Sequence, residues 1–176
     1  MNTRKADGFA LIDLLFVIAL IGVLSTIALP RMLLARQSAG AASAIGSMRV
    51  IHSSQLTFAL TCGGGFYAPN LTTLGQAPPG SNEAFISPNL ATSNTVTKSG
   101  YVIELDGSAF PGAPPSCNGL AAGEAAQGWR AYADPTNVDN KRFFATNVNG
   151  SIWESTGTLS AAMPEVGDPP IGQVLK

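Results

Sequence analysis

The stretch KADGFALIDLLFVIALIGVLSTIALPRM, which runs from Lys5 to Met32, decides the fold of this chain. Its apolar run from Phe9 to Leu29 contains fourteen Leu, Ile, Val and Phe residues. A helix of this length, at about 1.5 Å per residue, crosses the roughly 30 Å hydrocarbon core of a bilayer. The apolar side chains contribute about −4 to −8 kcal/mol to insertion, whereas one Asp costs about 3 kcal/mol at mid-membrane. We therefore expect a transmembrane helix despite Asp13.

The composition favours one folded domain and an anchor. The chain has 176 residues, of which 12% are charged and 45% hydrophobic, and this balance excludes a disordered charged tail. The charge is unevenly distributed: five bases and two acids occur through Asn82, and five bases and nine acids from Glu83 onward. The sequence thus predicts a basic membrane-proximal arm and a mildly acidic distal body.

The apolar run is also compatible with two simpler interpretations. Arg4 and Lys5 precede it, as in a secretory signal peptide, and small residues suitable for cleavage occur at 39–41 and 42–44. These sites lie ten or more residues beyond the run, which is longer than a usual signal core and contains an acid. An uncleaved anchor is the second interpretation, and basic residues on both sides leave its orientation undecided.

A third interpretation follows from the residues themselves. The segment GFALIDLL at 8–15, the basic leader before it, the glycine at 22 and the closing Ala28-Leu29-Pro30 resemble the class III signal of type IV pilins and pseudopilins. The resemblance implies that a prepilin peptidase removes the leader, residues 1–8, by cutting after Gly8, and that the new amine of Phe9 is methylated. It also implies a homo- or hetero-filament with other pilins, an inner-membrane assembly platform and a motor ATPase as partners.

The same resemblance implies a role for Asp13. It lies four residues beyond Phe9, on the same face of a helix as the amine that cleavage would create, and that amine has a pKa near 8. The resemblance implies that the acid at this position neutralises the terminal amine of a neighbouring subunit. The family usually has Glu here and Asp is one methylene shorter, so pairing within one subunit remains open. A carboxylate that only reaches the lipid headgroups is the plain alternative.

Gly22 and Pro30 interrupt the apolar helix. Glycine weakens a helix, and proline lacks an amide donor and clashes with the preceding turn. The pair predicts either a flexible stretch that opens in the filament, or close helix packing at Gly22 and a simple bend at Pro30.

The remaining chain predicts an α+β fold, in which the long N-terminal helix has a transmembrane half (9–29) and an amphipathic half (30–62). Its apolar face steps by four and three through Ala44, Met48, Ile51, Gln55 and Phe58. A connecting loop (63–98) with room for a short helical turn, a head built on a small antiparallel sheet of three to four strands (99–163) and a Pro-rich tail (164–176) follow. Strands are expected at 101–106, 129–133, 143–148 and 151–154, with Asn149-Gly150 as the hairpin turn. This architecture is also what the pilin resemblance implies.

Cys62 and Cys117 are the two cysteines of the chain. An even count beyond a membrane segment indicates an oxidising compartment and one disulfide, which would tie the end of the helix to the loop between the first two predicted strands. Two unrelated buried thiols are the alternative.

The sequence offers little for catalysis. The single histidine, His52, lies on the helix, and we expect it at the helix surface or facing the head. Metal-ligand spacing and phosphate-binding glycine motifs are absent from the sequence, so we predict no enzyme and no cofactor. Asp134 and Asp139 lie in a loop whose oxygens could bind calcium, although Asx turns explain the loop more simply. Sparse arginines and an acidic body disfavour nucleic acid as a partner.

These observations predict a structural subunit of a type IV pilus-type filament. The subunit would cross the inner membrane once, in contact with lipid, and then enter a filament at the cell surface or in the periplasm. A pseudopilin of a type II secretion system, a non-filament anchored binding module and an exported enzyme are the alternatives.

Overall fold

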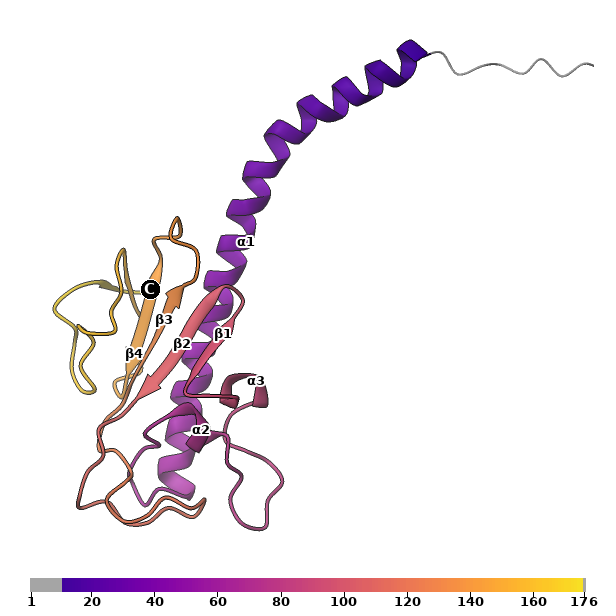
Figure 1. Cartoon of the computed structure of the whole chain (residues 1–176). Coiled ribbons are helices and arrows are strands. Elements are labelled where there is room, and N and C mark those ends of the chain that lie inside the picture. The colour runs from indigo at the N-terminus through magenta and orange to yellow at the C-terminus, as the bar shows by residue number, and fades with distance from the viewer. Residues whose placement is uncertain (1–10, 176) are drawn as a thin grey trace, which may run out of the picture. The chain divides into compact units, whose positions relative to one another are not determined.

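The computed structural model describes residues 11–175, which form two units: one ends at Ser38 and the other begins at Ala39. Helix α1 (Leu11–Thr61) belongs to both units and contains Pro30 within it. The second unit consists of the C-terminal part of α1, two short helices and a sheet that lies against α1 (Figure 1). We call this second unit the head.

The predicted apolar face of α1 is buried in the head. Each of its five residues is at most 1% exposed, and they include the large side chains of Met48, Ile51 and Phe58. Gln55 shares this face because its side-chain amide makes two hydrogen bonds with the backbone of Ala68, at 2.8 and 2.9 Å. A buried polar side chain is tolerated when its hydrogen bonds are satisfied in this way. Burial begins only at Gly40, so residues 31–36 remain exposed although the sequence predicts an amphipathic helix from Pro30.

The sheet has six strands in chain order, and each strand is antiparallel to the next. They are β1 (Thr95–Lys98), β2 (Tyr101–Asp106), β3 (Arg130–Pro135), β4 (Phe143–Asn147), β5 (Trp153–Ser155) and β6 (Gln173–Val174). The predicted alternation is confirmed in β2 and β3, where Tyr101, Ile103, Leu105, Ala131 and Ala133 are buried. These side chains pack with α1 in one core that also contains Trp129 and Phe144. The predicted α+β class is therefore confirmed.

The predicted strand count of three to four is wrong, partly because the expected connecting loop at 63–98 is structured. It contains α2 (Leu71–Leu74), α3 (Pro88–Ala91) and β1. Asn70 begins α2 by accepting a hydrogen bond from the backbone N–H of Thr73, at 2.9 Å. Strand β1 reads Thr-Val-Thr-Lys and turns into β2 through Ser99 and Gly100, both at positive φ, as a tight hairpin requires. The many Ser, Thr and Asn residues of this region are typical of a loop. Strand β1, in which Thr and Val are β-branched, was therefore not predicted.

The expected Pro-rich tail at 164–176 contributes a strand to the sheet within the described residues. Strand β6 pairs with β5, so the sheet continues beyond Met163. The side chain of Asn147 donates hydrogen bonds to the backbone oxygens of Pro164 and Gly167, at 3.0 and 2.6 Å. A buried asparagine on β4 thus holds the tail to the sheet, and a pattern of prolines gives no indication of such a contact.

The hairpin at Asn149-Gly150 is present with a different register. The predicted strand ends would pair Val148 with Ser151, whereas the structure pairs Ala145 with Trp153. The N–H of Gly150 bonds to the carbonyl of Asn147, at 2.9 Å, and Gly150 has a positive φ. Strand β4 ends at Asn147 and β5 begins at Trp153, so five residues connect them, with Gly150 in the left-handed conformation.

Two glycines of α1 lie in opposite environments and give a matched test of this packing. A Cβ on Gly40 would lie 2.6 Å from the carbonyl oxygen of Ser99, whereas a Cβ on Gly46 would meet nothing within 4 Å. Alanine in a helix interior is favoured over glycine by about 1 kcal/mol. We expect Gly46→Ala to stabilise the head by about 0.5–1 kcal/mol.

The same change at Gly40 is expected to destabilise the head by about 1–2 kcal/mol, because the turn after β1 must move away from α1. Denaturant unfolding of the full chain in detergent measures both free energies. Stabilisation by Gly40→Ala would show that the helix and the turn are not held in close contact.

Candidate functional site

The N-terminal part of α1 presents apolar side chains outward. Every large hydrophobic residue from Leu11 to Leu34 is at least 45% exposed. The segment is long and apolar enough to cross a membrane by length and composition, and a signal sequence has the same properties. It is therefore compatible with a single membrane-spanning anchor.

Asp13 is the acidic residue in the first turn of this helix, and it is exposed. The predicted cleavage and methylation residues, Gly8 and Phe9, lie outside the described residues. The pairing of Asp13 with the Phe9 amine thus stays a prediction. The surroundings of Asp13 are apolar side chains such as Leu14 and Phe16, which are exposed in the same helix.

Gly22 and Pro30 both lie within continuous helix. A Cβ on Gly22 would meet nothing within 4 Å, so the fold of this chain does not itself require a glycine there. Local opening of the helix between the two residues stays a prediction, as does close packing against another helix at Gly22.

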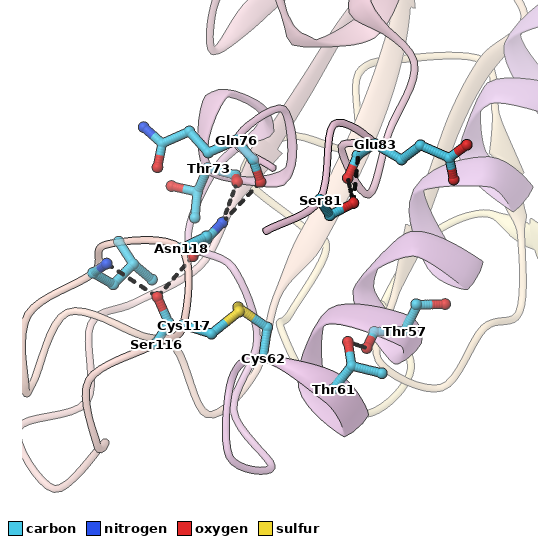
Figure 2. Close-up of a disulfide and its surroundings, with 11 residues drawn as sticks. Thr57, Thr61, Cys62, Thr73, Gln76, Ser81, Glu83, Ser116, Cys117 and Asn118 are labelled. Atoms are coloured by element: carbon cyan, nitrogen blue, oxygen red, sulfur yellow. Dashed lines mark hydrogen bonds between the residues drawn. A yellow bond between two sulfur atoms is a disulfide. The ribbon is translucent and has the colours of Figure 1, made fainter. Parts of the chain in front are cut away.

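The predicted disulfide between Cys62 and Cys117 is confirmed (Figure 2). Their Cα atoms are 4.9 Å apart, and the N–H of Cys117 donates to the carbonyl of Cys62, at 3.1 Å. Cys62 directly follows the end of α1, and Cys117 lies between β2 and β3, as expected. The bridge joins the last turn of the helix to a segment without regular secondary structure.

Hydrogen bonds extend the bridge to α2. Asn118 donates to the carbonyl oxygens of Thr73 and Gln76, at 2.8 and 3.2 Å, and accepts from the hydroxyl of Ser116, at 2.7 Å (Figure 2). Three segments, namely the end of α1, the α2 turn and the loop around Cys117, are thereby held together at one end of the head.

The two candidate calcium ligands have different surroundings. Asp134 accepts a hydrogen bond from the hydroxyl of Thr158, at 2.5 Å, and burial raises the pKa of its carboxyl. Asp139 is exposed, and its N–H donates to the side chain of Asn137, at 3.0 Å, which forms the expected Asx turn. Within residues 11–175, no group of three or more His, Cys, Asp or Glu side chains is placed to hold a metal ion.

His52 faces the head, between α1 and the β4–β5 connection. Its ring lies 5.8 Å from the ring of Trp129, and a Cβ on Gly150 would approach it to 2.7 Å. Nδ1 of His52 and Nε1 of Trp129 are buried and have no hydrogen-bond partner among the described residues. Burial lowers the pKa of His52, and a contact with the backbone of Asn147 opposes this shift.

Two ion pairs across neighbouring strands were not predicted. Arg130 bonds to Asp106, at 2.9 Å, and Arg142 bonds to Glu154, at 2.5 Å. These two pairs neutralise the charges of Arg130 and Arg142. Strand register places Arg130 opposite Asp106, whereas Arg142 directly precedes β4 and reaches Glu154, which lies opposite Phe144.

Comparison of the chain with protein-family models, with curated protein sequences and with solved structures gives no match.

Removal of the disulfide tests its contribution to the head. The bridge closes a loop of 55 residues, for which chain entropy alone gives about 4 kcal/mol. We expect Cys117→Ser to lower the free energy of unfolding by about 2–4 kcal/mol, as measured by denaturant unfolding of the full chain in detergent. Addition of a reductant should reproduce the loss in the unmodified chain and have no effect on the variant. An unchanged denaturation midpoint, both in Cys117→Ser and in the reduced unmodified chain, would contradict this expectation.

His52 predicts a pH dependence. Its pKa in the folded head lies below the ordinary value of 6.5, so the unfolded chain binds the proton more readily. Stability is fully present above about pH 6.5 and is lost as the pH falls toward the lower folded pKa. We expect the thermal midpoint of the full chain to fall between about pH 7.5 and 5, and to fall less in His52→Gln. Equal losses in both proteins would exclude His52 as the cause.

Proposed function

We propose that this chain is a structural subunit of a type IV pilin-like filament. The observation that carries the proposal is the exposed apolar half of α1, with Asp13 as its one acid, joined to a disulfide-bonded sheet head. A soluble protein rarely leaves so large an apolar surface uncovered. The segment needs either lipid or the same segment of other subunits around it.

The two environments are similar in energy. Lipid tails are about as apolar as leucine side chains, so hydrophobic burial changes little when the helix moves from the membrane into a bundle. Packing and polar contacts must then determine the position of each subunit. A cationic amine on Phe9 and the carboxylate of Asp13 would supply such a contact in a low-dielectric setting.

The head would remain outside the apolar bundle. An oxidising compartment such as the periplasm or the cell surface permits its disulfide. In this proposal a prepilin peptidase cuts after Gly8, an inner-membrane platform and a motor ATPase extract the processed subunit, and the apolar helices bundle in the filament core. A type II secretion pseudopilus would use the same subunit architecture.

The deciding experiment is intact-mass and N-terminal peptide analysis of the native protein, from sheared cell-surface material and from membranes. The proposal expects a chain that begins at N-methylated Phe9 in the sheared fraction. A processed chain that is confined to the periplasmic side of intact cells would favour the pseudopilin. A chain that begins at Met1 and occurs only in membranes, or one cut after Ala41 or Ala44, would overturn the proposal.

Asp13 gives a second test with a matched control. We expect Asp13→Ala to be processed normally and to lower filament yield at least about tenfold, because a buried amine without its partner is strongly unfavourable. Asp13→Glu keeps the charge and should retain filaments. Gly8→Ala should instead block leader removal, which appears as an unprocessed mass. Normal filaments from Asp13→Ala would exclude the pairing role.

A further inference from the structure

The arginines of α1 have no carboxylate nearby in the sequence. Arg31, Arg36 and Arg49 are the charged residues of the helix after Asp13, and no Asp or Glu occurs again until Glu83. Helical salt bridges form between residues three or four apart, so none of these arginines can be neutralised within the helix.

The structure does not provide partners for them elsewhere. All three arginines are exposed, and none makes an ion pair or a side-chain hydrogen bond with the described residues. Arg130 and Arg142 differ in this respect, because each bonds to a carboxylate. Of the five described bases without an ion pair, three therefore lie on α1, and Lys98 and Lys141 are the other two.

Three carboxylates of the head are in the complementary situation. Glu83, Asp139 and Asp168 are exposed, and their side chains make no ion pair with the described residues. Other acids of the head have partners: Asp106 and Glu154 bond to arginines, and Glu165 accepts from Ser108. The head thus presents surplus negative charge outward while α1 presents surplus positive charge.

We propose that Arg31 and Arg36 bind exposed carboxylates on the head of a second copy of this chain. The proposal rests on the proposed function, and it identifies the polar contact that would join the helix of one subunit to the head of another. Complementary charge on two surfaces of one chain favours head-to-tail association, in which one surface of each copy meets the other surface of the next. Arg31 and Arg36 directly follow the apolar run, so they would lie where the bundled helices end and the heads begin.

This contact would act chiefly on orientation and register. Exposed ion pairs contribute little each, and like charges opposed across an interface are costly, so charge excludes wrong alignments more strongly than it stabilises the correct one. A helical filament repeats the contact at every subunit, which makes a small contribution per pair measurable in filament yield.

The test uses the full chain in cells that make the filament, with sheared filaments and membrane-resident processed chain measured separately. We expect the double variant Arg31→Glu/Arg36→Glu to lower the sheared fraction at least about tenfold and to leave the processed chain in membranes unchanged. The conservative double variant Arg31→Lys/Arg36→Lys should retain filaments because it keeps the charge. Lys141→Glu reverses an exposed head charge and serves as the matched control, with filament yield expected within about twofold of the unmodified chain.

Second-site reversal decides which surface binds the arginines. We expect that one of Glu83→Lys, Asp139→Lys and Asp168→Lys, in the Arg31→Glu/Arg36→Glu background, restores the sheared fraction by at least about threefold. Restoration by none of the three would overturn the proposal. A loss of processed chain from membranes in the double variant would also overturn it, and would indicate that anionic lipid headgroups bind these arginines.

Different results would overturn the proposed function and the inference about Arg31 and Arg36. Absence of a chain beginning at Phe9 from the sheared fraction of unmodified cells overturns both the proposed function and this inference. Normal filaments from the double variant overturn only the inference and leave the proposed function in place.

Discussion

The contact between the C-terminal part of α1 and the sheet is the interaction on which the rest of the head depends. Met48, Ile51 and Phe58 fill a core with side chains of β2, β3 and β4, and Gly40 lets the turn after β1 approach the helix backbone. Ala131 and Ala133 are the small residues that β3 contributes to this core, whereas β2 contributes Tyr101, Ile103 and Leu105. The small residues of β3 leave room for the larger side chains of α1 in this core.

A second constraint acts at the end of this helix. The chain must leave α1 at Thr61, pass through three consecutive glycines and return to the core within a few residues. Gly64 and Gly65 take positive φ there, and the disulfide fixes the helix end against the loop around Cys117. Gln55 satisfies the backbone of Ala68 on the return path. Polar and covalent contacts therefore hold this end of the head, where regular strands do not reach.

The N-terminal half of α1 differs from the C-terminal half in its exposure. Its large apolar side chains between Leu11 and Leu34 are exposed, and its only acid is Asp13. The same helix thus serves as a core element after Ala39 and as an apolar surface for an external environment before it. The three arginines of α1 make no ion pair with the described residues, and the exposed carboxylates Glu83, Asp139 and Asp168 lie beyond this helix.

The sequence by itself determined the elements whose signal is local. Apolar length predicts the N-terminal helix, spacing by three and four predicts the buried stripe at 44–58, and alternation predicts β2 and β3, since each depends only on the geometry of one element. The cysteine count indicated the disulfide, although not its hydrogen-bonded surroundings at Ser116 and Asn118.

Apart from the disulfide, the contacts that join distant segments were decided by the tertiary structure. The strand β6, the tail held by Asn147, the register after Asn147, the pairing of Arg130 with Asp106 and the setting of His52 beside Trp129 all arise from side chains far apart in the chain. Single-element periodicity carries no information about which partner a strand edge or a buried polar atom meets. Short strands such as β1 and β6 form because the neighbouring strand has backbone N–H and C=O groups that need hydrogen-bond partners. These groups are in place only after the rest of the sheet has formed.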